Sequence, residues 1–186
     1  MEKSEIEAIV REVLQRTMKM QDAEKGFEPV KGQNADGKSR ASVESPRTTM
    51  PLALAVKLIE KIEAKAAEWD MRVVTAVSDA SGRPVAVHCM DGAYIGSFDV
   101  ALNKTYTSIA FQMSTEQLGI LSQPGESLYG IQFTNEGKIV IFGGGELLVK
   151  NGTIVGALGV SGGSAKQDTA LAAYGREIFK SMEQEV

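Results

Sequence analysis

Apolar residues recur at helical spacing in several stretches of the chain, as on one buried face of a helix. The pattern predicts helices over residues 1–20, 51–69, 97–111, 114–121 and 165–182. Pro51 suits the first turn of the second helix, and Ser164 with Gln167 forms a capping box at the start of the last. These local signals agree with the apolar period.

Runs rich in β-branched residues lie between the helices. They cover residues 72–78, 84–90, 138–142, 146–150 and 153–160. Turn residues join two pairs of these runs, Asp79 to Gly82 in the first and Asn151-Gly152, which suits a type I′ turn, in the second. Strands joined by tight turns are antiparallel, so the sequence predicts an α+β fold with an antiparallel sheet of about five strands flanked by α-helices.

Two glycine clusters flank the second hairpin. They consist of Gly143, Gly144, Gly145, Gly162 and Gly163. One face of the strand between them bears Ala157 and Gly159, so a helix, a ligand or another subunit must approach that backbone closely. Strand, glycine turn and helix start follow one another at residue 161, and this arrangement either binds an anion or only lets the chain turn sharply. The Walker A and dinucleotide glycine patterns are both missing from the sequence, which argues against nucleotide binding.

The N-terminal third is organised differently. Residues 1–20 form an amphipathic helix, and residues 21–49 lack periodicity and are rich in turn-forming and charged residues, as in a flexible linker. Residues 50–186 then form the globular domain. A helix on such a tether either folds back as an arm or presents its apolar face to a partner.

Composition narrows the functional classes. A net charge of -4 argues against a nucleic-acid surface, and no apolar run is long enough to span a bilayer. The single cysteine, Cys89, rules out an intrachain disulfide and favours a cytoplasmic location.

His88 is the only histidine, and it limits the possible chemistry. Its neighbour Cys89 points to the opposite face of the same predicted strand, so the two cannot form a catalytic dyad. One histidine and one cysteine are too few for a closed zinc site. Haem iron needs only one imidazole, so His88 is either a metal ligand or a half-buried histidine with a satisfied hydrogen bond.

Lys104 is the only charged residue in the interior of the helix over residues 97–111. It either meets the carboxylate of a ligand or is a solvated charge. No nucleophile–base pair is readable in the sequence, so no catalytic residue is assigned. Enzymatic activity stays open, and a non-catalytic role is favoured.

Three blocks of sequence resemble the GlcG/HbpS-like family, which includes the C-terminal domain of PduO. They cover residues 77–93, 97–115 and 138–168. The resemblance implies a profilin-like sheet, homo-oligomers and binding of haem b, with a corrinoid as the alternative cofactor. It makes His88 the candidate iron ligand, with Lys104 and the glycines Gly143, Gly144, Gly145, Gly162 and Gly163 as candidate cofactor contacts at a subunit boundary.

Residues 1–20 resemble the encapsulation peptides that direct proteins into bacterial microcompartments. This resemblance implies shell or cargo proteins as partners and a location in the microcompartment lumen. The sequence thus predicts a haem- or corrinoid-binding accessory protein that supports cofactor redox or maintenance. An oligomeric interaction protein of the same fold without cofactor and an enzyme acting on a small organic substrate are the alternatives.

Overall fold

The computed structural model describes residues 50–182. These residues all belong to one compact unit of the chain. The helix predicted over residues 1–20 and the linker over residues 21–49 lie outside the described residues.

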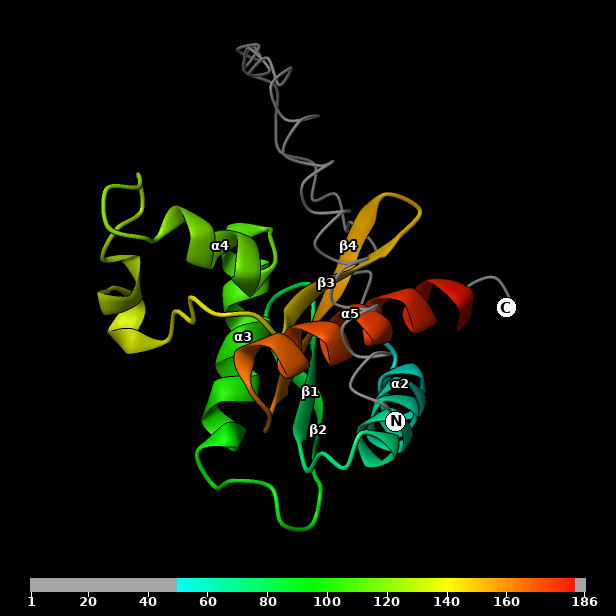
Figure 1. The fold of residues 1–186 in the computed structure, drawn as a ribbon. Helices are drawn as coiled ribbons and strands as arrows, with labels where there is room; N and C mark the ends of the chain where they lie inside the picture. The colour runs from blue at the N-terminus through cyan, green and yellow to red at the C-terminus, as the bar shows by residue number, and fades with distance from the viewer. Residues whose placement is uncertain (1–49, 183–186) are drawn as a thin grey trace, which may run out of the picture. The chain divides into compact units, whose positions relative to one another are not determined.

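The helices and strands follow one another in the predicted order, except that the strand predicted over residues 138–142 is absent (Figure 1). The α-helices are α2 (Leu52–Glu68), α3 (Ser97–Phe111), α4 (Thr115–Leu121) and α5 (Ala165–Met182). The strands are β1 (Val74–Asp79), β2 (Pro84–Cys89), β3 (Gly145–Lys150) and β4 (Thr153–Ser161). Two 3₁₀ turns, η2 (Ile131–Phe133) and η3 (Asn135–Gly137), lie in the long connection from α4 to β3.

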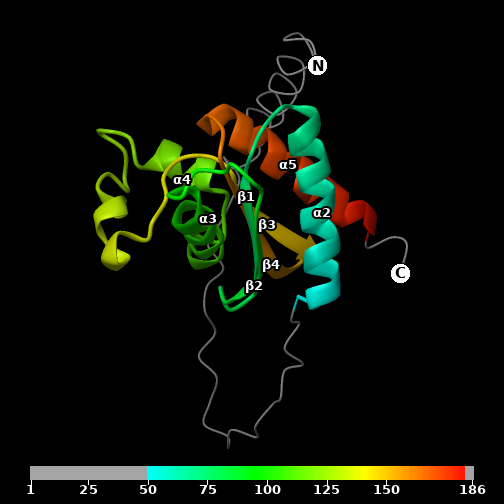
Figure 2. The ribbon, with the colours of Figure 1, turned by 90° about the horizontal axis from the view of Figure 1, so that it is seen from below.

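The strands form one antiparallel sheet with the order β2-β1-β4-β3. Helix α3 covers one face of this sheet, and α2 and α5 cover the other (Figures 1 and 2). The α+β class and the antiparallel sheet flanked by helices are therefore confirmed.

Helix α2 shows why the second face is apolar. Its buried residues repeat at helical spacing and face the sheet and α5; they are Ala55, Leu58, Ile59, Ile62 and Ala66. Gly175 of α5 has no room for a side chain, because a Cβ there would crowd Ile62 and Leu158. Each large apolar side chain buried in this layer contributes about 1.5–3 kcal/mol.

Helix α3 is the element that approaches the small-residue face of β4. A Cβ on Gly159 would overlap the carbonyl oxygen of Ala101 in α3. The sequence left a helix, a ligand or another subunit as candidates for this contact, and the helix takes it. Glycine at this position lets α3 pack directly on the strand backbone.

One predicted strand is wrong. Residues 138–142 do not join the sheet, which has four strands among residues 50–182 rather than about five. The segment packs against the helices instead: the Val140 amide donates to the Thr107 hydroxyl of α3 (3.0 Å), and Gly119 of α4 lies against the Ile141 carbonyl. The Thr107 side chain and close packing against the helices thus fix this backbone segment, which its β-forming residues alone would predict to be a strand.

The hairpin from β3 to β4 is confirmed. Asn151 and Gly152 both have a positive φ, 49° and 75°, as a type I′ turn requires. None of the helices within residues 50–182 is long and apolar enough to cross a membrane.

Candidate functional site

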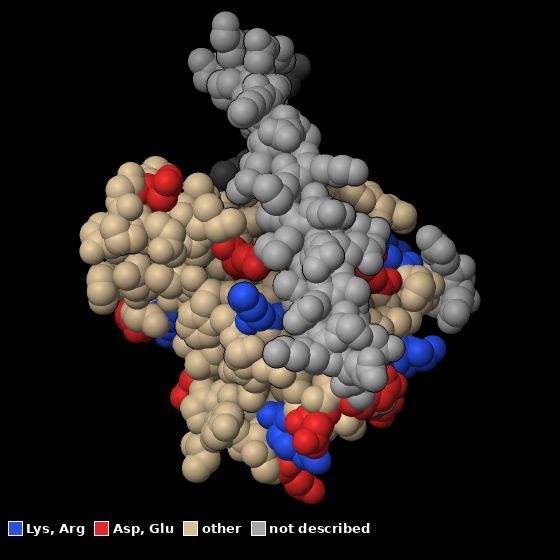
Figure 3. Space-filling model, viewed as in Figure 1, with Lys and Arg blue, Asp and Glu red and all other residues tan. Residues whose placement is uncertain are grey.

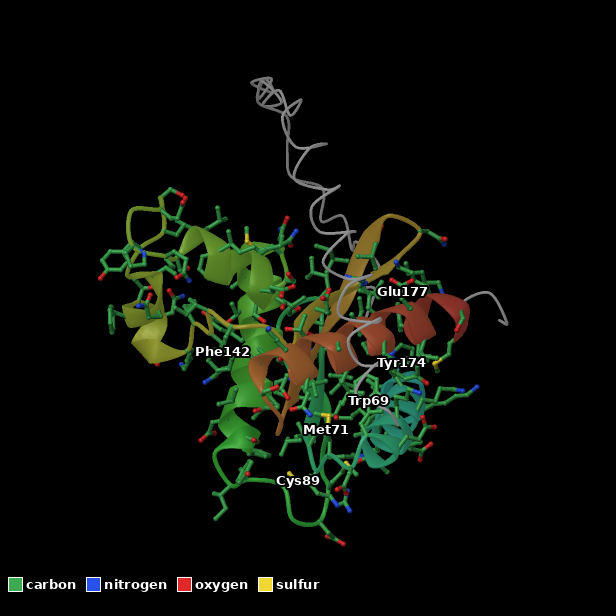
Figure 4. All side chains as sticks on the ribbon, in the orientation of Figure 1. Trp69, Met71, Cys89, Phe142, Tyr174 and Glu177 are labelled. Carbon is green, nitrogen blue, oxygen red and sulfur yellow. The ribbon has the colours of Figure 1, made fainter. Side chains whose placement is uncertain are left out.

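Lys104 lies fully buried on the side of α3 that faces the sheet. Its ammonium group donates to the Val160 carbonyl oxygen of β4 (2.6 Å) and to Asp168 Oδ2 of α5 (2.8 Å). The Phe142 ring lies beside it, with its centre 5.0 Å from Nζ. Figure 4 shows Phe142 near the start of α5. Lys104 is therefore not a solvated charge, because one carboxylate, one carbonyl and one ring surround it.

Burial acts on both members of this ion pair. Desolvation lowers the pKa of Lys104 below its usual range, and the attraction of Asp168 offsets only part of that effect. Desolvation likewise raises the pKa of Asp168, against the opposing effects of Lys104 and of the Gly162 and Gly163 amides. Removing one partner would leave the other charge buried and uncompensated.

The first glycine cluster provides the room for this pair. A Cβ on Gly144 would lie 2.6 Å from Lys104 Nζ and 2.9 Å from the Asp168 Cβ. A Cβ on Gly145 would lie 2.8 Å from Ser108 Oγ, and the Gly145 amide donates to the Thr115 hydroxyl (2.9 Å). The glycines thus bring the chain close enough to α3 and α5 to enclose the Lys104 ammonium.

The second cluster binds an anion that belongs to the chain itself. The Gly163 amide donates to Asp168 Oδ1 (2.9 Å), and the Gly162 backbone also bonds to this carboxylate. Gly162 is tightly packed, since a Cβ there would overlap the Arg72 carbonyl oxygen. The turn is sharp, and its backbone amides donate to a carboxylate of the chain itself; binding of an external anion here stays a prediction.

The capping box at the start of α5 is confirmed. The Ser164 amide donates to Gln167 Oε1 (3.0 Å), and the Gln167 amide donates to the Ser164 hydroxyl (3.3 Å). The helix start therefore uses its own side chains for amides that could otherwise bind a ligand.

His88 lies on the other face of the sheet, in β2. Its Nδ1 is 3.2 Å from Glu63 Oε1 of α2, and its side chain is 34% exposed. Cys89 points to the α3 side, where its strand partner Val74 packs against Ala101. In Figure 4, Cys89 lies at the end of the sheet where the chain leaves β2 for α3. The imidazole is thus oriented by one carboxylate and stays partly exposed to solvent.

The structure therefore divides the candidate residues in two. Lys104, Gly144, Gly162 and Gly163 lie at Asp168, and Gly143 and Gly145 pack against Thr169 and Thr115 nearby. His88 lies apart from them in β2, beside Glu63 of α2. Sequence reasoning missed both carboxylates. A signal existed for Asp168, which follows the Gly162-Gly163 turn in the first turn of a helix, where an acidic residue is favoured.

A second group of charges lies between β3, α4 and α5. Glu146 accepts a hydrogen bond from Arg176 (2.8 Å), and desolvation raises its pKa against the opposing effect of that guanidinium. Desolvation alone raises the pKa of Glu116 in α4. Within residues 50–182, no group of three or more His, Cys, Asp or Glu side chains could hold a metal ion.

The sheet with α3 on one face and paired helices on the other defines a class of small α+β domains, and the comparisons with known proteins give the family. Residues 50–177 match the family described as haem degrading protein HbpS-like. The chain belongs to this HbpS-like family.

Individual relatives agree with this assignment. The chain is 42% identical over 134 residues to an uncharacterized 15.0 kDa protein of the dhaT-dhaS intergenic region of Citrobacter freundii, which covers 72% of this chain and 94% of that one. It is 35% identical over 130 residues to the corrinoid adenosyltransferase PduO of Salmonella typhimurium, over 68% of this chain but only 39% of PduO. The crystal structure of a PduOC:heme complex matches with a TM-score of 0.67 and 32% identity, over 69% of this chain and 94% of that chain.

Proposed function

We propose that this chain is a haem-binding accessory protein and that His88 supplies a ligand to the iron. The observation that carries the proposal is the geometry of His88: Nδ1 lies 3.2 Å from Glu63 Oε1, and the side chain is 34% exposed, so part of the ring is accessible to a ligand. Histidines that ligate metals usually have such a carboxylate partner on the other ring nitrogen. The family and the similarity to a PduOC:heme complex support haem as the cofactor.

Each residue has one role in the proposed haem site. Bound haem supplies an iron that can change oxidation state. His88 would hold it through Nε2, and Glu63 fixes the orientation of the ring. With haem bound in this way, the protein would support cofactor redox or maintenance.

Contacts from Lys104 and the two glycine clusters to the cofactor stay a prediction. Lys104 is buried with Asp168 as its counter-ion, so a haem propionate would have to reach it in competition with that carboxylate. The Lys104→Met variant separates the roles: a stability loss with unchanged haem affinity assigns Lys104 to folding alone.

Self-association is part of the proposal. Large apolar side chains stay exposed on the segment from α4 to β3, among them Tyr129 and Phe133. Figure 3 shows that few charged residues cover this segment on the visible face. Exposed apolar surface of this kind is typical of contacts between proteins.

Residues 1–20 are proposed to address the chain to a bacterial microcompartment. The apolar stripe in their sequence and the similarity of the domain to PduO support this role. Deleting residues 1–20 should abolish co-sedimentation with shells while the domain stays folded by circular dichroism. Unchanged co-sedimentation would refute the address.

Absorbance spectroscopy tests the cofactor. Adding haem b to the full chain should shift the Soret band. The shift should saturate at one haem per chain, because each chain has one His88. A parallel titration with a corrinoid tests the alternative cofactor. A chain that leaves both spectra unchanged yet forms a defined oligomer would be an interaction protein without cofactor.

A further inference from the structure

Strand β2 is an edge of the sheet, and β1 is its single neighbour among residues 50–182. Just past its end, the Met90 amide donates to the Val73 carbonyl (3.0 Å). In an antiparallel ladder the direction alternates, so the backbone of His88 also faces β1, and that of Val87 and Cys89 faces the open edge. Such an edge is a template for pairing with another strand.

The opposite edge, β3, is protected in ways that β2 is not. Thr115 of α4 accepts a hydrogen bond from the first residue of β3, and Glu146 within the strand is paired with Arg176. Strand β2 contains no Asp, Glu, Lys or Arg, and only Pro84, at its first position, discourages pairing. Among residues 50–182, the β3 edge of the sheet is therefore protected and the β2 edge has no neighbouring strand.

Apolar side chains extend the open edge beyond the strand. Tyr94, Ile95 and Phe98 are 74%, 96% and 43% exposed. They lie in the connection from β2 to the first turn of α3, which projects past the end of the sheet in Figure 1. Strand β2 together with these three residues is called the β2 edge surface below.

Charges at the two ends of β2 identify the occupant. Arg83, directly before the strand, has a side chain that is 71% exposed and lies 3.4 Å from Asp79 of its own chain, and Asp91, just after the strand, is exposed as well. When two copies of β2 pair antiparallel about a two-fold axis, Arg83 of each copy comes next to Asp91 of the other. The uncharged strand between them adds no like-charge contact. The surface is complementary to itself.

We infer that the β2 edge surface is a two-fold interface between copies of this chain, in which two four-stranded sheets join edge to edge. The inference deepens the proposed self-association, on which it rests, by naming a second surface besides the segment between α4 and β3. It does not require haem. Because His88 lies in β2, the proposed iron ligand would lie at this interface.

Hydrogen exchange on the full chain tests the pairing without any substitution. The Val87 and Cys89 amides should exchange at least about tenfold more slowly at protein concentrations where light scattering shows association than at concentrations where the 19.9 kDa chain is alone. The β3 amides should show no such change. Self-association that leaves β2 exchange unchanged would overturn the surface but not the oligomer, and a chain that never associates would overturn both.

Charge reversal tests whether a second copy of the chain occupies the β2 edge surface. Arg83→Glu and Asp91→Lys should each weaken association about fivefold, and the double variant R83E/D91K should recover it. Lys166→Glu, an exposed reversal on α5, which packs on β3 and β4, is the matched control and should have no effect. If the β2 amides are protected in a monomeric chain and do not respond to these reversals, residues 1–49 cover the β2 edge. That result would overturn the inference.

Discussion

Two polar side chains on opposite faces of the sheet, Lys104 and His88, lie in opposite environments. On the α3 face, Lys104 is sealed from solvent and every strong partner comes from the chain: Val160, Asp168 and the Phe142 ring. On the α2 face, His88 is half exposed and has one recorded partner, Glu63. A group whose bonding capacity is filled internally serves the fold. A group held in orientation with one position open can serve a ligand.

The largest effect should come from breaking the sealed face. Lys104→Met removes the counter-ion of Asp168 and should lower the free energy of unfolding by about 3–5 kcal/mol in urea denaturation. The double variant K104M/D168N should cost less than the sum of the single variants, because it removes both buried charges. Additive losses would show that the two side chains do not act as a pair.

Close packing on the same face gives the next effect. Gly159→Ala forces a methyl group against the Ala101 carbonyl oxygen and should cost about 1–3 kcal/mol. Gly96→Ala is the matched control, since a Cβ there meets nothing within 4 Å and the φ of -65° suits alanine. Equal stability of the two variants would contradict the close approach of α3.

The contrast also explains what the sequence could predict. Periodicity placed α3 at its observed bounds, and Asn151-Gly152 marked the hairpin, because both signals are local. Residues 138–142 carry a local β signal that a contact 33 residues away overrides, the bond from the Val140 amide to Thr107. Lys104 and His88 stood out by residue type. Their partners did not, because Asp168 and Glu63 lie 64 and 25 residues away and only the fold brings them close.

On the open face, the carboxylate should matter for binding rather than for folding. Glu63→Gln keeps the size of the side chain but removes the charge that orients His88, and should weaken haem binding about tenfold to a hundredfold. Glu60→Gln, an exposed change on the same helix, is the control. Equal haem affinity of both variants would remove Glu63 from the site.

The smallest effect concerns pH. Burial raises the pKa of Glu116 above its ordinary value of 4.5, so the folded chain binds this proton more tightly than the unfolded chain. Stability from this group therefore falls as the pH rises from 4.5 through the folded-state pKa. Glu116→Gln should flatten that slope and raise stability at pH 7 by roughly 0.5 kcal/mol. Thermal melts at pH 4.5 and pH 7 measure it, and a variant that is less stable at pH 7 would contradict the assigned cause.

Haem titration of the His88→Ala variant, with and without added imidazole, tests the central claim most directly. Substitution of a half-exposed side chain should leave the fold intact, so a change in the spectrum reports on the ligand. We expect the Soret shift of the unmodified chain to be lost in His88→Ala and to return when imidazole fills the vacated position. An identical shift in both proteins would show that His88 is not the ligand.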